Sequence, residues 1–308
     1  MTASSGCNRG SRAPARSEKK AAMPLTIPTW MRRLLPRRFR ETPPRVAVVR
    51  LSGAIGAVSP IRAGLSIGTV APSLERAFTM PGLSAVALVI NSPGGSPVQS
   101  HLIYRRIRAL AAEKEIKVFA FVEDAAASGG YMIACAADEI VADPASLVGS
   151  IGVVSAGFGF DRLIERIGIE RRVHTQGEAK AMLDPFRPEN PLDIARLKEI
   201  QADVQALFSG LVRERRPTLD ASRDLFTGAV WTGRQALELG LVDAIGDLRG
   251  TLRARYGEKV DLRLVAENRG SWLARLLRRA GPGQTAAGLP DALIAAVEER
   301  AAWARLGL

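Results

Sequence analysis

The sequence predicts an α/β fold built on a mostly parallel sheet, and three observations lead to this prediction. Strand-like and helix-like segments alternate between residues 45 and 265. Ala85–Asn91 is a continuous apolar run, which is typical of a strand buried on both faces of a parallel sheet. The chain has 308 residues, of which 47% are apolar, so it can bury the core of one large domain or two small ones.

The predicted elements follow one another in a right-handed β-α-β progression. The first four alternate between strand and helix, at Arg45–Leu51, Thr69–Met80, Ala85–Asn91 and Pro97–Glu113. The second helix has Pro97 near its first turn, where the missing N–H of proline costs nothing. A third strand, a helix of small residues that follows a turn, and a short fourth strand are predicted at Lys117–Val122, Ala125–Ala136 and Glu139–Ala142.

Most of the net charge of +12 lies at the two ends of the chain. Residues 1–44 carry 10 basic and 2 acidic side chains, residues 269–308 carry 6 and 3, and the stretch between them carries 27 and 26. An enzyme acting on nucleic acid holds basic residues along a groove of its folded body, so nucleic-acid binding is not predicted. Basic ends suit an anionic membrane surface, although they can also be simply soluble tails.

Three regions are predicted: a disordered, basic amphipathic arm (1–44), a catalytic domain (45–265) and basic amphipathic C-terminal helices (266–308). In residues 28–40, apolar side chains alternate with five arginines, which suits a membrane interface or packing on a neighbouring subunit. We expect no transmembrane helix and no signal peptide, hence a location in the cytoplasm or peripheral to the cytoplasmic membrane. Two cysteines and two histidines predict neither a disulfide framework nor a zinc site, and no cofactor is expected.

Two glycine-containing turns follow consecutive core strands, at Gly94-Gly95 and at Ala127-Ser-Gly-Gly130. Ligands of open α/β sheets bind at these carboxyl ends of the strands. Ser128 at a helix start, with the Gly129 amide beside it, suits a nucleophile with half of an oxyanion hole, and an amide of Gly94 or Gly95 would supply the other half. The alternative is structural, with Ser128 as an ordinary N-cap and the glycine pair as an ordinary turn.

A serine nucleophile needs a base, and neither histidine is convincing. His101 falls inside a predicted helix, and His174 lies in a strand-like segment without an obvious carboxylate partner. A lysine can serve when burial or a neighbouring cation lowers its pKa. Only 7 of the 43 basic residues are lysines, and Lys180 stands apart in a loop of mixed apolar character. Its alternative is a solvated loop lysine.

Five motifs occur in order: Asn91-Ser-Pro-Gly-Gly95, Ala127-Ser-Gly-Gly-Tyr131, Val148-Gly-Ser-Ile-Gly-Val153, Lys180-Ala-Met-Leu-Asp-Pro-Phe186 and the stretch Thr232–Asp243. With these motifs the chain resembles the signal peptide peptidase A family of Ser/Lys-dyad peptidases, in its short form with a single catalytic domain. The resemblance implies a Clp-protease/crotonase-like fold of repeated ββα units. It also implies Ser128 as nucleophile, Lys180 as general base held by the Ser150 hydroxyl, and an oxyanion hole from Gly129 and the Gly94–Gly95 turn.

The resemblance further implies peptide substrates, such as cleaved signal peptides or other apolar peptides. Members of the family form rings or domes, so we expect a homo-oligomer in which Lys180 approaches Ser128 of a neighbour. The family's usual N-terminal transmembrane anchor is not predicted here, and the Arg-rich arm is a candidate to replace it. No P-loop is present, so proteolysis independent of ATP is expected.

The sequence leaves two other functions open. A crotonase-type acyl-CoA enzyme would share the two-amide oxyanion hole but would use Glu or Asp chemistry, so it would keep activity after Ser128→Ala. An inactive membrane-surface scaffold would lack a reactive serine, and the assembled protein would not be labelled by a fluorophosphonate at Ser128.

Overall fold

The computed structural model describes residues 43–56, 64–266, 297 and 300–308. Its strands are β1 (Arg45–Ser52), β2 (Leu83–Ser92), β3 (Lys117–Ala127), β4 (Glu139–Ala142), β5 (Leu147–Gly149), β6 (Val230–Thr232), β7 (Ala244–Ile245) and β8 (Asp261–Leu264). Its helices are α2 (Ile67–Phe78), α3 (Pro97–Lys114), α4 (Gly129–Ala134), α5 (Asp161–Arg166), the 3-10 helix η2 (Glu178–Ala181), α6 (Pro191–Arg215), α7 (Gly233–Glu238) and α8 (Leu248–Tyr256). Most of the predicted N-terminal arm and C-terminal helices lie outside the described residues.

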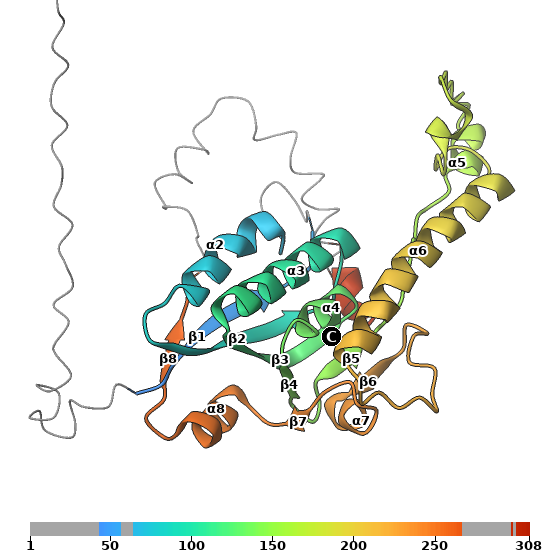
Figure 1. The fold of residues 1–308 in the computed structure, drawn as a ribbon. Coiled ribbons are helices and arrows are strands. Elements are labelled where there is room, and N and C mark those ends of the chain that lie inside the picture. Colours follow the sequence, from blue (N-terminus) through green and yellow to red (C-terminus); the bar gives the residue numbers. More distant parts are fainter. Residues whose placement is uncertain (1–42, 57–63, 267–296, 298–299) are drawn as a thin grey trace, which may run out of the picture. The chain divides into compact units, whose positions relative to one another are not determined.

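The strands form one sheet in the order β6-β5-β3-β2-β1-β8, with β4 pairing with β3 and β7 pairing with β4 (Figure 1). All pairs are parallel except β5 with β6. The predicted α/β class with a mostly parallel sheet is confirmed. The central strand β2 is buried along Ala85–Ile90, as its unbroken apolar run predicts.

Helices cover both faces of the sheet because alternate residues of each strand point to opposite sides. Val86, Leu88 and Ile90 of β2 belong to the apolar cluster that includes α2, α3 and α4. Ala85, Ala87 and Val89 belong to a second cluster, on the face covered by α8. The buried ends of β2 and β3 therefore have little freedom to shift, which fixes the turns that follow them.

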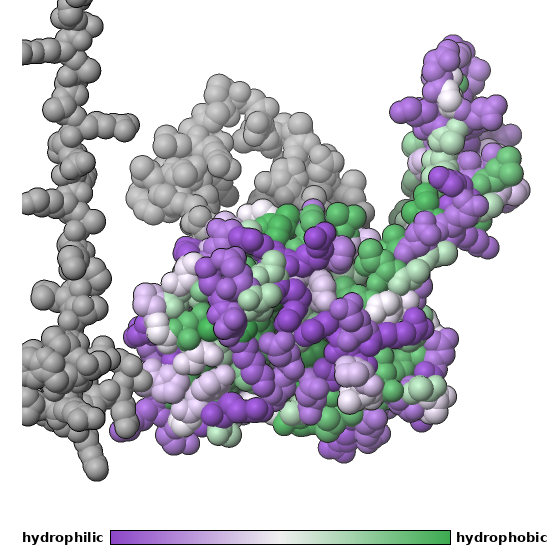
Figure 2. All heavy atoms as spheres, viewed as in Figure 1, coloured by the Kyte–Doolittle hydropathy of each residue, from purple (hydrophilic) through white to green (hydrophobic). Residues whose placement is uncertain are grey.

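The stretch from Gly152 to Leu207, hereafter the exposed segment, contains no buried residue. It includes α5, η2 and the first two thirds of α6, which becomes buried only from Phe208. Large apolar side chains along this segment are exposed to solvent, with Phe158 81% and Leu192 77% exposed. Figure 2 shows such apolar residues interspersed with polar ones on this segment.

The strand-like interpretation of the residues around His174 is wrong, because they lie in irregular backbone of the exposed segment with no strand to pair with. Among the described residues, no helix combines the length and the apolar character needed to cross a bilayer.

Candidate active site

The Gly94–Gly95 turn and the Ser128 turn lie against each other at the carboxyl ends of β2 and β3. A Cβ atom on Gly94 would lie 2.8 Å from the Ser128 Cβ and 3.0 Å from the Gly129 nitrogen. Contacts of that kind are too close for any side chain, and Gly94 also has a φ of +99°. Position 94 therefore requires glycine so that the backbone can approach the serine.

A bulge in β3 directs the chain toward Ser128. Ile90 of β2 pairs with Val122 and Ser92 pairs with Ala126, so three residues of β3 face the single residue Asn91. The Asn91 side chain fits into this irregularity, accepting from the Ala125 N–H at 3.3 Å and donating to Asp124 at 2.6 Å. Bulges of this kind bend a strand and re-aim the residues that follow. The predicted strand end at Val122 was too early for this reason.

Ser128 has an unusual backbone conformation for a non-glycine residue, with φ +52° and ψ −119°. Such a conformation costs about 1–3 kcal/mol and persists only where the surroundings enforce it. Ser128 is the N-cap residue of α4, as its alternative interpretation has it, but its side chain makes no capping hydrogen bond to the helix. Its backbone N–H donates to the Gly149 carbonyl at 2.8 Å. Ser128 is half-buried, and its hydroxyl at the start of α4 is not used to cap the helix.

Small residues let α4 lie close to its neighbours. A Cβ on Gly130 would lie 2.8 Å from the Ser92 carbonyl oxygen, and one on Gly129 would collide with the Ser100 hydroxyl. The fully buried Tyr131 then holds the helix by donating to the Leu241 carbonyl at 2.8 Å. Burial is also the main reason why the pKa of Tyr131 is raised well above its ordinary value.

The two candidate oxyanion donors of the glycine turn differ in their partners. The Gly94 N–H donates to the Ser92 hydroxyl at 3.2 Å. Ile55 binds the backbone on both sides of Gly95, accepting from Ser96 and donating to the Gly94 carbonyl, both at 2.8 Å. Within the described part of the chain, the N–H groups of Gly95 and Gly129 have no hydrogen-bond acceptor. Gly95 is therefore the donor with an available N–H, while Gly94 supplies the close approach.

The turn that carries Ser150 lies beside Ser128, because β5 pairs with β3 so that Gly149 faces Ala127. Gly149 and Ser150 both have positive φ, +111° and +50°. The Ser150 N–H donates to the Ala229 carbonyl at 2.7 Å. Ser128 and the Gly149–Ser150 turn are therefore neighbours through direct backbone contact.

Lys180 is not brought to this group of residues within one chain. It lies on η2 in the exposed segment, and its side chain is exposed. Among the described residues its ammonium makes no hydrogen bond or ion pair, and its backbone N–H donates to the Gly177 carbonyl at 3.2 Å. The structure thus assembles Ser128, the glycine turns and Ser150, and leaves Lys180 on a surface.

Within the residues that the structure describes, neither histidine forms a hydrogen bond with Ser128. His101 lies on α3 and stacks on Tyr104 with ring centroids 6.2 Å apart. Partial burial, with the nearby Arg105, lowers the pKa of His101. His174 lies in the exposed segment. In the described part of the chain, no cluster of three metal-ligating side chains occurs either.

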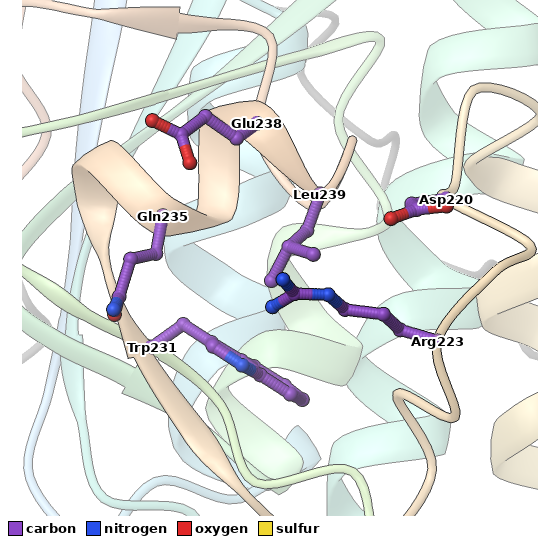
Figure 3. Close-up of a pocket in the computed structure, with 6 residues that line it drawn as sticks. All are labelled: Asp220, Arg223, Trp231, Gln235, Glu238 and Leu239. Carbon is purple, nitrogen blue, oxygen red and sulfur yellow. The ribbon is translucent and has the colours of Figure 1, made fainter.

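A cavity of about 340 Å³ lies beside α7 and is lined in part by Trp231 of β6 (Figure 3). Its lining residues are Asp220, Arg223, Trp231, Gln235, Glu238 and Leu239. The Trp231 ring also packs on Gly149, so this side chain contacts both the cavity and the turn that carries Ser150. Trp231 was not predicted from the sequence, although it directly precedes the Thr232–Asp243 motif.

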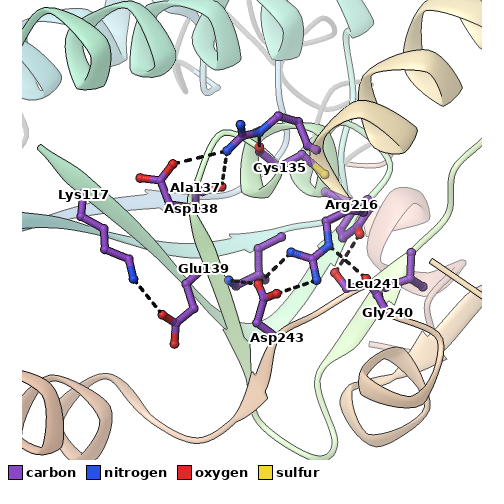
Figure 4. Close-up of polar contacts among 12 residues, drawn as sticks. Lys117, Cys135, Ala137, Asp138, Glu139, Arg216, Gly240, Leu241 and Asp243 are labelled. Atoms are coloured by element: carbon purple, nitrogen blue, oxygen red, sulfur yellow. Dashed lines mark hydrogen bonds and ion pairs between the residues drawn. The ribbon is translucent and has the colours of Figure 1, made fainter. Parts of the chain in front are cut away.

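The C-terminal end of α6 is bound to the end of α4 (Figure 4). Arg215 donates to the carbonyls of Cys135 at 3.0 Å and Ala137 at 2.9 Å. The next residue, Arg216, forms two hydrogen bonds with Asp243, of 2.7 and 2.9 Å. Burial raises the pKa of the Cys135 thiol to about 12, so this cysteine is not a nucleophile at neutral pH. Arg215 therefore holds the end of α6, which continues the exposed segment, against the end of α4, the helix that follows Ser128.

Comparison with known proteins points to proteases. The model of the family described as peptidase family S49 matches residues 111–262. A putative protease of Synechocystis is 32% identical over 236 residues, covering 74% of this chain and 81% of that protein. The chloroplastic serine protease SPPA of Arabidopsis thaliana is 33% identical over 214 residues, which are 66% of this chain and 31% of that protein.

A longer match carries a different name. A protein of Brucella abortus named Na(+)/H(+) antiporter NhaA is 51% identical over 316 residues, covering 99% of this chain. The match covers only 43% of that protein, so this chain spans less than half of its length.

Proposed function

Because the chain belongs to peptidase family S49, the family of the signal peptide peptidase A enzymes, we propose that it is a serine endopeptidase with Ser128 as nucleophile. The observation that carries the proposal is the setting of Ser128. Its backbone is held at positive φ, its hydroxyl makes no capping bond, and the N–H groups of Gly129 beside it and of Gly95 in the facing turn lack acceptors in the described part of the chain. Strained nucleophiles at strand-to-helix turns are typical of hydrolases.

In the proposed reaction, the Ser128 oxygen attacks the carbonyl carbon of the peptide bond. The N–H groups of Gly129 and Gly95 donate to the oxygen that becomes negatively charged. Neutral Lys180, oriented by the Ser150 hydroxyl, takes the serine proton and passes it to the leaving amine. Water activated by the same lysine then attacks the acyl-enzyme and releases the second product.

We propose that Lys180 serves the Ser128 of a neighbouring copy. A lysine serves as a general base where it is shielded from water, and the side chain of Lys180 is exposed in a lone chain. Packing the exposed segment on a neighbour would bury Lys180 together with apolar side chains such as Phe158 and Leu192. The homo-oligomer expected from the sequence is therefore part of this proposal.

The proposed substrates are extended apolar peptides, including cleaved signal peptides, bound by strand addition. A further relative, from Enterococcus faecium, is named putative signal peptide peptidase SppA. Association of the basic ends with an anionic membrane surface stays a proposal about residues that lie mostly outside the described part. Family membership favours peptide hydrolysis over the acyl-CoA alternative.

Peptide hydrolysis by four preparations tests the proposal: wild type, Ser128→Ala, Lys180→Ala, and an equimolar mixture of the two variants assembled together. Each variant alone should be folded and nearly inactive, since nucleophile and base act as a unit. The mixture should recover about a quarter of wild-type activity, because random assembly pairs an intact Ser128 with an intact neighbouring Lys180 in about one site of four. Wild-type activity of Ser128→Ala would refute the peptidase mechanism, and an unrescued mixture would refute only the exchange between copies.

A further inference from the structure

We propose that Trp231 is a positioning residue, whose indole holds the Gly149–Ser150 turn in place beside Ser128. The inference rests on the proposed function, because the turn matters only if Ser128 and Ser150 act in the reaction. Trp231 itself would touch neither the substrate nor the reacting atoms.

The first support is a direct packing contact. A Cβ atom on Gly149 would lie 2.6 Å from Cε3 and 2.7 Å from Cζ3 of the Trp231 ring, distances that real Cβ atoms do not reach. The six-membered ring therefore lies against the Gly149 backbone without a side chain between them. Gly149 is buried, so this contact is shielded from water.

The second support is the conformation of the turn. Gly149 and Ser150 are consecutive residues with positive φ, and Ser150 is not a glycine. Such a pair does not hold its shape by itself, since other conformations are lower in energy. On one side it is held by the Ser128 N–H, which donates to the Gly149 carbonyl at 2.8 Å. On the other side it is held by Ala229 and by the Trp231 ring.

The third support is the cavity that the indole lines (Figure 3). Arg223, Gln235 and Glu238 line it and are exposed, so the cavity is in contact with solvent. Trp231 thus contacts both this cavity of about 340 Å³ and the Gly149–Ser150 turn. Removing the indole would enlarge a space that is open to solvent and would leave the turn without the ring that packs on Gly149.

The consequence for the reaction follows from the position of Ser150, one residue after the carbonyl that binds Ser128. A loosened turn moves the Ser150 hydroxyl away from the lysine amine that it orients, and misplacements of about 1 Å cost up to about 100-fold in rate. We expect Trp231→Ala to lower kcat by about 10- to 100-fold with little change in KM. Trp231→Phe should keep most of the activity, because a six-membered ring remains against Gly149.

A double-mutant cycle with Ser150→Ala distinguishes positioning from general destabilisation. If Trp231 acts through Ser150, adding Trp231→Ala to Ser150→Ala should lower kcat no further. Losses that multiply in the double variant would overturn the proposal, and so would an unchanged kcat in Trp231→Ala. Arg223→Ala is the matched control: it changes the same cavity without touching Gly149, and its kcat should equal that of the wild type.

Two further measurements cover the other outcomes. If Trp231→Ala does not fold, Trp231→Leu fills part of the space, and wild-type kcat in that variant would contradict the proposal. Free indole should restore part of the activity of Trp231→Ala but none in the double variant, and an equal gain in both would contradict it. Full activity of Ser150→Ala would refute the role given to Ser150 in the proposed function and, with it, any role of Trp231 that acts through Ser150. A low kcat in Ser150→Ala together with wild-type kcat in Trp231→Ala would refute the proposal for Trp231 alone.

Discussion

Arg216 and Asp243 form a two-pronged ion pair in which the arginine is almost wholly buried. The guanidinium donates to both carboxylate oxygens, at 2.7 and 2.9 Å, and also to the Gly240 carbonyl at 3.0 Å (Figure 4). Asp243 accepts in addition from the Ile140 N–H at 2.7 Å. The pair therefore ties the end of α6 to both β4 and the loop after α7. Its place beside Tyr131 also connects it to the helix that follows Ser128.

Asp243→Ala should strongly destabilise the domain. It leaves the buried Arg216 cation without its counter-ion, and breaking a buried pair in this way costs about 3–5 kcal/mol. Urea denaturation followed by circular dichroism measures the change. The control is Glu199→Ala, which removes an exposed pair with Arg196 and should cost less than about 1 kcal/mol. A similar decrease in the free energy of unfolding in both variants would show that the buried Asp243 pair stabilises the domain no more than an exposed pair does.

Arg215→Gln should disturb the position of Lys180 toward the neighbouring copy more than it disturbs the reactivity of Ser128 in its own chain. Arg215 holds the last turn of α6, and α6 continues directly from the segment that carries Lys180. In mixed assemblies, Ser128→Ala with Arg215→Gln should fail to rescue Lys180→Ala. The reciprocal mixture, with Arg215→Gln in the Lys180→Ala chain, should still be rescued by Ser128→Ala. Equal rescue in both mixtures, measured by peptide hydrolysis, would rule out this directional role.

Gly94→Ala should abolish activity because its methyl group would press on Ser128 and Gly129. We expect a loss of at least about 100-fold in kcat, as for other small displacements of reacting groups. Gly82→Ala is a matched control, since Gly82 also has positive φ, +70°, but a Cβ there would meet nothing within 4 Å. The control should therefore lose some stability and retain activity. Comparable activity of the two variants in peptide hydrolysis would contradict the close approach seen at Gly94.

The buried thiol of Cys135 should make the domain less stable at alkaline pH. Its pKa is raised from 9.0 to about 12 in the folded chain, with burial as the main cause. Above pH 9 the unfolded chain loses this proton while the folded chain keeps it, so unfolding becomes more favourable as the pH rises toward 12. The free energy of unfolding should therefore fall more steeply between pH 9 and 11 in the wild type than in Cys135→Ala. Parallel curves from urea titrations would contradict the expectation.

The sequence determined the elements of the first hundred residues of the domain. Apolar runs and helical periodicity are local signals, and the predicted helix Pro97–Glu113 agrees with α3 to within one residue. The glycine turns after β2 and β3 were also identified from local composition. Because both strands are parallel and adjacent, their carboxyl ends meet at one edge. Part of the candidate site could therefore be predicted before any coordinates.

Tertiary structure alone decided how these turns fit together. The bulge of β3 depends on the Asn91 side chain, the conformation of Ser128 on the Gly149 carbonyl, and the packing of Gly149 on Trp231. Residues 128, 149 and 231 are far apart in the chain, so no local pattern records their contacts. The residue type of Lys180 likewise does not tell whether its side chain is exposed, because burial depends on how the surfaces pack and not on the lysine itself.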